Sequence, residues 1–249
     1  MQTYVFLDLD DTILQTRPKC PPGEPLHPAA YHRDGSPLSF MTERQRSLLA
    51  LLAAAATVIP TTARNLDAFR RVRLSFSSLA VLDFGGVILQ PDGTPDPGWD
   101  AVVRPQAEQA GPELRELLRA VQGFIAARGL GVNARLIADF DMPLYLVLKH
   151  PAGDCVALQT VLREHWAAVD PGRYFVHSNG NNLSLVPCFL GKERAVRHIL
   201  ERHLGPEPVL TIGVGDSLSD APFLGLCDYA LLPRDCQLAA AVLAPRRAP

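Results

Sequence analysis

An apolar run that ends abruptly in acids is the feature of this sequence that most constrains its fold. Residues 4–7 have the composition of a buried strand, and Asp8, Asp10 and Asp11 follow it directly. Ligands of open parallel sheets bind at the carboxyl ends of the strands, so acids placed here would face a site while the strand stays buried. Neighbouring carboxylates repel one another, and Mg²⁺ prefers hard oxygen ligands. The pattern therefore predicts a magnesium site at the edge of a parallel sheet.

Composition excludes several classes of protein. The 249 residues, 47% of them apolar, suffice for one large domain or two modest ones. With 24 Lys and Arg against 26 Asp and Glu and no basic block, we expect no nucleic-acid partner. No segment has the roughly 18 uninterrupted apolar residues of a membrane span, and no leader pattern precedes the first strand, so we expect a cytoplasmic protein without a membrane partner. The 5 cysteines lack Cys-x-x-Cys spacing and are predicted to be reduced. Oligomeric state is left open.

The segment directly after the acids, residues 15–39, is rich in proline and glycine, which excludes a continuous helix. Loops of this length in compact domains are usually functional or disordered, and this one begins beside the predicted site. We expect an ordered excursion that faces the substrate, with a passive loop as the alternative.

Strand and helix patterns then alternate. Thr42 is placed to cap an apolar helix that runs to about Ala56. A short strand at residues 58–60, a helix at 66–74 and a strand at 79–82 follow. Such alternation is typical of a parallel sheet with crossover helices.

The middle of the chain changes character. Residues 83–94 carry two turn signals around an apolar run, which predicts a hairpin that leaves the sheet. Beyond it we expect helices within 99–128 with a break at Gly111-Pro112, strands at 145–148, 174–177 and 183–186, a helix at 154–168, and a hairpin turn at 179–182. These elements predict a small inserted α+β domain at residues 89–187.

The first pattern resumes afterwards, with an amphipathic helix at 192–204 and strands at 209–214 and 229–232. We therefore predict an α/β fold, a doubly wound (Rossmann-like) parallel sheet core made of residues 1–88 and 188–249.

Three predicted strands end in polar clusters, and parallel strands would bring these ends to one edge. Each cluster alone has an ordinary explanation as a turn or helix cap, and Lys192 alone would be an ordinary helix lysine. Their joint occurrence favours a site. Its members are Asp8 and Asp10, Thr62 and Arg64, Lys192, and Asp216 and Asp220.

In this order, the clusters make the chain resemble the haloacid dehalogenase-like superfamily of phosphohydrolases. The matching motifs are Asp8-Leu9-Asp10-Asp11-Thr12, Thr62, Lys192 and Gly215-Asp216-Ser217-Leu218-Ser219-Asp220. The resemblance covers about residues 1–88 and 188–235. The insert stands where the branch with a large α+β cap carries its cap, a branch that includes sucrose-phosphate, mannosyl-phosphoglycerate and phosphomannose enzymes.

The resemblance implies roles for these residues. Asp8 would be the nucleophile that forms an aspartyl-phosphate, and Asp10 would protonate the leaving oxygen and then activate water. Thr62 would bind a phosphoryl oxygen with help from Arg64, and Lys192 would neutralise charge and hold Asp8.

The metal site implied by the resemblance is a Mg²⁺ site. Asp8, the backbone carbonyl of Asp10, and Asp216 would bind the ion, with Asp220 as a further ligand or as a residue that orients the others. Two departures from the family pattern stand out. Ala63 occupies the usual glycine of Thr-Gly-Arg, and the excursion at residues 15–39 is longer than the short connection expected in this branch. Thr61 could also be the phosphate contact, although the alignment to Arg64 favours Thr62.

The implied activity is that of a Mg²⁺-dependent phosphatase of a small phosphorylated metabolite, with a sugar phosphate as one candidate. Related enzymes that cleave carbon–halogen bonds lack the second acid, so Asp10 favours phosphoryl transfer. Two alternatives remain open: a phosphomutase with the same intermediate, and a non-catalytic protein that binds a phosphorylated ligand.

Overall fold

The computed structural model describes residues 1–243 and divides into two units. The first unit comprises Met1–Asp96 and the chain from Gly191, and the second comprises Pro97–Leu190. The predicted boundaries lay after residues 88 and 187, whereas the structure assigns residues 89–96 to the first unit and 188–190 to the second. The part of the predicted core range beyond residue 243 lies outside the described residues.

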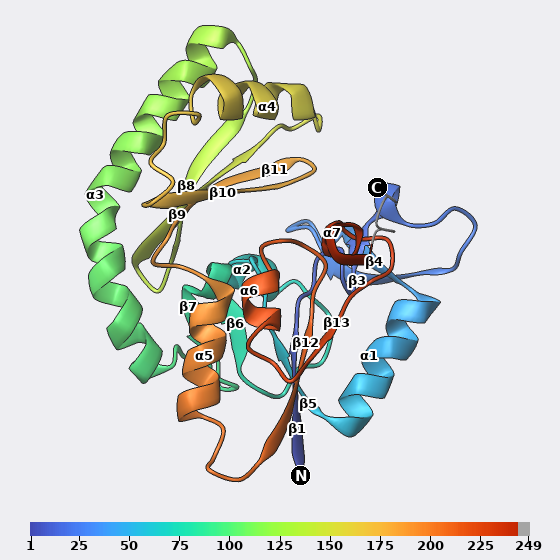
Figure 1. Ribbon diagram of the computed structural model, residues 1–249. Helices are drawn as coiled ribbons and strands as arrows, with labels where there is room; N and C mark the ends of the chain where they lie inside the picture. The colour runs from blue at the N-terminus through green and yellow to red at the C-terminus, as the bar shows by residue number, and fades with distance from the viewer. Residues whose placement is uncertain (244–249) are drawn as a thin grey trace, which may run out of the picture. The chain divides into compact units, whose positions relative to one another are not determined.

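The first unit is built on a parallel sheet with the strand order β13-β12-β1-β5 (Figure 1). The strands are β1 (Gln2–Leu7), β5 (Thr57–Pro60), β12 (Val209–Val214) and β13 (Tyr229–Leu231). Helix α1 (Glu43–Ala55) lies on one side of the sheet, and α5 (Lys192–Arg202) and α6 (Ala221–Leu224) lie on the other (Figure 1). Because β1 alternates its side chains, Val5 and Leu7 join the cluster that includes Leu52 of α1, while the fully buried Phe6 faces the opposite side. The predicted doubly wound α/β core is confirmed.

The excursion after β1 forms a small antiparallel sheet of its own. Its elements are β2 (Gln15–Thr16), the short 3₁₀ helix η1 (Arg17–Lys19), β3 (Leu26–Tyr31) and β4 (Pro37–Thr42), and the strand order is β2-β4-β3. Ala29, Ala30 and Met41 are buried in the same cluster as Val5 and Leu7. The predicted ordered segment without a continuous helix is therefore present, and its role toward a substrate stays a prediction.

The helix predicted at residues 66–74 is too long, because the residues after its first turn pair with this small sheet. Helix α2 covers only Leu66–Phe69. The backbone of the following residues bonds to β3 instead, with the Arg71 carbonyl accepting from the Tyr31 N–H at 3.1 Å and the Arg73 N–H donating to Ala29 at 2.7 Å. These long-range bonds end the helix after one turn.

The strand predicted at residues 79–82 is also placed differently. Strand β6 (Ala80–Leu82) pairs antiparallel with β7 (Val87–Leu89), and its link to the parallel sheet is one bridge between Thr61 and Val81. The hairpin predicted at this position is present.

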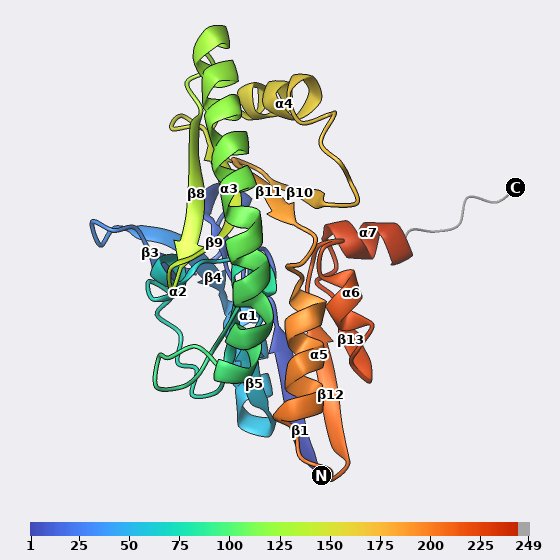
Figure 2. The same ribbon diagram turned by 90° about the vertical axis from the view of Figure 1, so that its left-hand side faces the viewer.

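The second unit packs two helices on one face of an antiparallel sheet. The strand order is β10-β11-β9-β8, formed by β8 (Asn133–Asp139), β9 (Met142–Lys149), β10 (Tyr174–Asn179) and β11 (Asn182–Pro187). Helix α3 (Pro97–Arg128) lies along β8 and β9 in Figure 2, and its Leu114 and Val121 share a core with Leu158 and Val161 of α4 (Cys155–Glu164). The α+β character and the Asn179–Asn182 hairpin are as predicted.

The break predicted at Gly111-Pro112 is wrong, because α3 is one helix of 32 residues. Gly111 has a packing role instead. A Cβ at Gly111 would lie 2.9 Å from the ring of Pro143, so the glycine allows α3 to approach β9 closely. The strand β8 was not predicted.

The start of α5 depends on contact between two glycines. The short 3₁₀ segment η2 (Asp83–Gly85) ends at Gly85 with a φ of 91°. A Cβ there would lie 2.2 Å from the carbonyl oxygen of Gly191, the residue before Lys192. Gly85 therefore permits both a left-handed backbone and the close approach that fixes where α5 begins.

Two further observations concern the cysteines and the possibility of a membrane-spanning helix. All five cysteines are free thiols. Among the helices of residues 1–243, none is long and apolar enough to cross a membrane.

The contact at Gly85 generates a stability prediction. Gly85→Ala should lower the free energy of unfolding by roughly 2 kcal/mol more than Gly93→Ala, since overpacking adds to the backbone strain. Gly93 is a matched control because it has a similar φ of 86° but nothing within 4 Å of its Cβ position. Urea unfolding of both variants measures the difference, and equal losses would contradict the packing role.

Candidate active site

The ends of three neighbouring strands meet at one edge of the parallel sheet. β1 lies between β12 and β5 in parallel register. The Asp8 N–H donates to Val214 at the end of β12 at 2.8 Å, and the Thr61 N–H donates to Leu7 at 2.8 Å. The predicted convergence of the three polar clusters is thus present in the fold.

A buried lysine joins two of these clusters. The ammonium of Lys192 lies 2.6 Å from Asp8 Oδ1 and 2.7 Å from Asp220 Oδ1. The three side chains are at most 6% exposed. Burial opposes the charge of Lys192, but Asp220 and Asp8 outweigh this effect and raise its pKa. Lys192 is therefore a permanent cation that holds the two acids together.

Thr12 connects Asp8 to the third carboxylate. Its hydroxyl donates to Asp8 Oδ2 at 2.9 Å and lies 3.3 Å from Asp216 Oδ1. Both oxygens of Asp8 are consequently held in place, one by Lys192 and one by Thr12. This bridging role was not predicted, although Thr12 belongs to the same motif and follows Asp8 by four positions.

Asp220 organises the loop that carries Asp216. Its Oδ2 accepts hydrogen bonds from Ser217 N–H at 3.0 Å, the Ser217 hydroxyl at 2.8 Å and Asp216 N–H at 3.2 Å. Gly215 leaves room for this arrangement, since a Cβ there would lie 2.7 Å from Asp220 Cβ. Because Asp220 is fully buried and its Oδ2 already accepts three hydrogen bonds, it fits the orienting alternative better than direct metal ligation.

The cluster carries excess negative charge. Carboxylate oxygens of Asp8, Asp216 and Asp220 lie within 4.8 Å of one another, and Lys192 supplies one positive charge. Burial raises the pKa of Asp8, and Asp220 adds to the rise, although Lys192 opposes it. Burial also opposes ionisation of Asp220, but Lys192 and Ser217 lower its pKa. Burial and the charges of Asp220 and Asp11 raise the pKa of Asp216 to about 6.

This charge imbalance fits a divalent cation, which would offset two negative charges. Oxygens of Asp8 and Asp216 are the donor set that Mg²⁺ prefers. Asp216 is also only partly buried, so an ion could reach it from solvent.

Arg64 and Asp10 form a separate ion pair at the same edge. Arg64 Nε and Nη2 each lie 2.7 Å from an oxygen of Asp10, which is a two-pronged geometry. Although burial disfavours its charge, Asp10 raises the pKa of Arg64. The Asp10 side chain is 40% exposed. Arg64 is therefore a direct partner of Asp10, a contact that was not predicted.

The two candidate threonines differ in how they use their hydroxyl groups. Thr61 donates its hydroxyl proton to the carbonyl of Ile59 at 3.2 Å. Thr62 instead accepts the N–H of Arg64 at 3.1 Å, which leaves its proton for a donor role. The hydrogen bonds favour Thr62 as the residue that could bind an anion.

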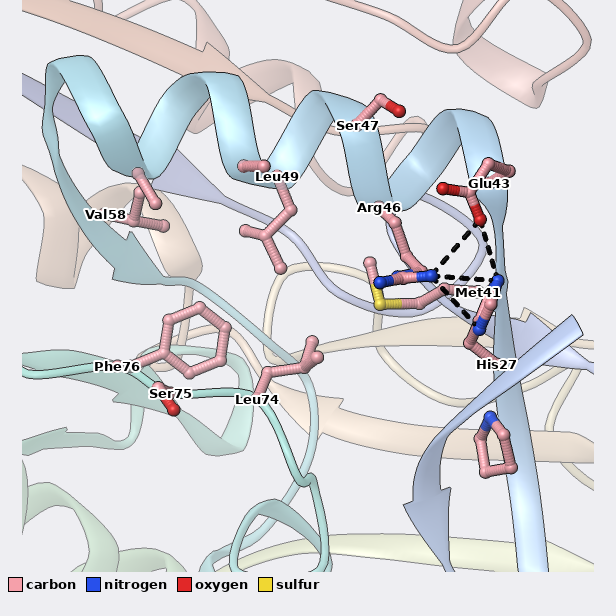
Figure 3. A pocket seen from close by; sticks show the side chains of 13 residues that line it. His27, Met41, Glu43, Arg46, Ser47, Leu49, Val58, Leu74, Ser75 and Phe76 are labelled. Carbon is pink, nitrogen blue, oxygen red and sulfur yellow. Dashed lines mark hydrogen bonds and ion pairs between the residues drawn. The ribbon is translucent and has the colours of Figure 1, made fainter.

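A separate pocket of about 480 Å³ lies elsewhere in the first unit, between α1 and residues 74–76 (Figure 3). Leu49, Leu74 and Phe76 give it apolar walls. At one end Glu43 pairs with Arg46 at 3.2 Å and with His27 at 2.8 Å. These side chains bond to one another, and the residues that line the pocket include none of the predicted site residues.

Comparison with known proteins supports the fold assignment. No family model matches the sequence, and no curated protein matches it. Solved structures do match, in 78 chains, and three of them are described next.
The trehalose-6-phosphate phosphatase C-terminal domain of C. albicans has 12% identity over 90% of this chain and 73% of that chain, with a TM-score of 0.54.
Thermoplasma acidophilum 0175 has 14% identity over 95% and 87%, with a TM-score of 0.54.
A trehalose-6-phosphate phosphatase related protein has 13% identity over 92% and 86%, with a TM-score of 0.50.

The chain shares the fold of these solved structures and has a Rossmann-like core with an inserted α+β unit. At 12–14% identity the comparisons establish the fold alone. An activity has to be argued from the site.

The raised pKa of Asp216 generates a prediction about stability. An acid whose pKa is higher in the folded state than in the unfolded state lowers the stability of the fold when it ionises. For Asp216 this loss is complete above the folded pKa of about 6 and absent below about pH 4. Asp216→Asn should therefore stabilise the metal-free protein at pH 7.5 by about 1–2 kcal/mol, a figure reduced for partial solvent exposure.

Thermal unfolding in the presence of a chelator measures this gain, which should shrink as the pH falls through 6. Asp235→Asn is the control, since Asp235 is exposed and outside the cluster. A less stable Asp216→Asn protein at pH 7.5 would contradict the charge imbalance.

Proposed function

We propose that the protein is a Mg²⁺-dependent phosphatase that hydrolyses a small phosphorylated metabolite through an aspartyl-phosphate on Asp8. The observation that carries the proposal is the buried Lys192 cation beside Asp8, with Asp216 close by and Thr12 between the two acids. A cation, a fixed carboxylate and a metal-binding acid at one sheet edge are the requirements of phosphoryl transfer.

Asp8 is the nucleophile in this proposal. Lys192 and Thr12 fix its two oxygens, so little orientation remains to be lost when a phosphoryl group arrives. An oxygen of Asp8 attacks phosphorus as the ester oxygen leaves, and water then hydrolyses the acyl phosphate. Lys192 also balances the charge of the transferring group.

The proposed metal ligands are Asp8, Asp216 and the backbone carbonyl of Asp10. When bound, Mg²⁺ would neutralise phosphoryl oxygens and orient them toward the nucleophile. Asp220 holds Lys192 and the loop of Asp216 in place and does not bind the metal directly in this account.

Asp10 is the proposed general acid and base. It would give a proton to the leaving oxygen and then take one from the attacking water. The two hydrogen bonds from Arg64 orient the Asp10 carboxylate, and at least one of them must break before Asp10 can be protonated. Arg64 and Thr62 are proposed to contact the phosphorylated substrate as well.

A sugar phosphate is the substrate class we favour, because two of the matching structures carry the name of trehalose-6-phosphate phosphatase or a related protein. The cytoplasmic location and the lack of nucleic-acid and membrane partners stay predictions from the sequence.

The nucleophile assignment is tested by substitution. Purified protein should release phosphate from an activated aryl phosphate with Mg²⁺ and lose the activity with a chelator. Asp8→Asn should lower kcat at least about 10³-fold, because the amide is a poor nucleophile. Unaltered kcat in this variant would refute the mechanism.

The threonine assignment allows a matched comparison. Thr62→Val should lower kcat/KM by about 10-fold or more, since one hydrogen bond to a charged oxygen contributes about 1.5–3 kcal/mol. Thr61→Val, at the adjacent and equally buried position, should keep more activity. Steady-state kinetics with the same aryl phosphate decide between them, and the reverse order would assign the contact to Thr61.

A further inference from the structure

Two histidines and an aspartate meet in the first unit outside the site described above. Asp96 Oδ1 lies 3.5 Å from His198 Nε2, and Asp96 Oδ2 lies 3.2 Å from His203 Nε2. One ligand atom from each residue lies within 4.8 Å of the other two. None of these residues has a role in the proposed hydrolysis.

From this geometry we propose that Asp96, His198 and His203 form a binding site for a divalent transition-metal ion of the Zn²⁺ type. Ligand atoms bound to tetrahedral zinc at about 2.0–2.2 Å lie about 3.3–3.6 Å apart. The separations of 3.5 and 3.2 Å involve different oxygens of Asp96, so the carboxylate faces both imidazoles, and one ligand atom from each residue lies within 4.8 Å of the other two. Two imidazoles with one carboxylate suit zinc and similar ions, whereas Mg²⁺ and Ca²⁺ prefer oxygen donors.

The surroundings of the three residues suit metal entry. The Asp96 side chain is 7% exposed and its backbone N–H donates to Ile88 at 2.7 Å, so the carboxylate sits on a fixed segment. The ring of His203 is 28% exposed at the end of α5, which gives an ion a path from solvent.

The position of the site indicates a structural role. His198 lies within α5, His203 follows the helix directly, and Asp96 ends the segment after β7. A metal would thus tie α5, whose first residue is Lys192, to the β6–β7 hairpin. Three protein ligands leave a further position for water.

Zinc binding by the full chain tests the proposal. Metal-stripped protein in millimolar Mg²⁺, which competes at the oxygen-rich cluster, is titrated with Zn²⁺ against a chromophoric zinc chelator. The wild type should bind one equivalent of Zn²⁺ that millimolar Mg²⁺ does not displace. His198→Asn and His203→Asn should each weaken this binding at least about tenfold. His32→Asn, at an exposed histidine elsewhere, should bind as the wild type does.

A second measurement keeps the result clear if a variant folds poorly. Anomalous diffraction at the zinc edge from wild-type crystals should show a peak within bonding distance of Asp96, His198 and His203. Three results would overturn the proposal: no zinc binding by the wild type in Mg²⁺, wild-type zinc affinity in both histidine variants, or an anomalous peak only at another place. None of these readouts depends on phosphatase activity.

Discussion

The buried ammonium of Lys192, held between Asp8 and Asp220, is the interaction on which the rest of the site depends. Its three residues come from the end of β1, the start of α5 and the loop after β12. Removing a charge from water costs several kcal/mol, and only close partners repay it. The position of α5 is therefore critical, and it is set by the Gly85–Gly191 contact and by the apolar face that Ala195 and Ile199 present to the core.

The same cluster shows how stability and function oppose each other. Lys192 balances one carboxylate, and the remaining negative charge raises the pKa of Asp216 and disfavours the metal-free folded state. That unbalanced charge is also what would attract a divalent cation. Asp10 stands apart, because Arg64 already balances its charge at 2.7 Å. The sheet edge thus keeps the proposed metal-binding carboxylates electrostatically distinct from the carboxylate proposed to carry the proton.

The strands and the convergence of their polar ends could be predicted because both follow from local pattern. Apolar runs such as residues 209–214 mark buried strands, and parallel register brings their ends together. Features that depend on distant partners could not be predicted. Gly111 resembles a helix break until Pro143 is seen against it, and residues 71–73 leave the helical pattern only because β3 binds them. The pairing of Arg64 with Asp10 spans 54 positions and has no local signal.

Chemical trapping of the intermediate tests the central claim most directly. Protein turning over an aryl phosphate with Mg²⁺ is quenched with borohydride, which reduces an aspartyl-phosphate and leaves free carboxylates intact, and the modified peptide is mapped by mass spectrometry. The account predicts reduction at Asp8 and at none of Asp10, Asp216 or Asp220. Reduction at another of these acids, or phosphate release with no trapped residue, would contradict it.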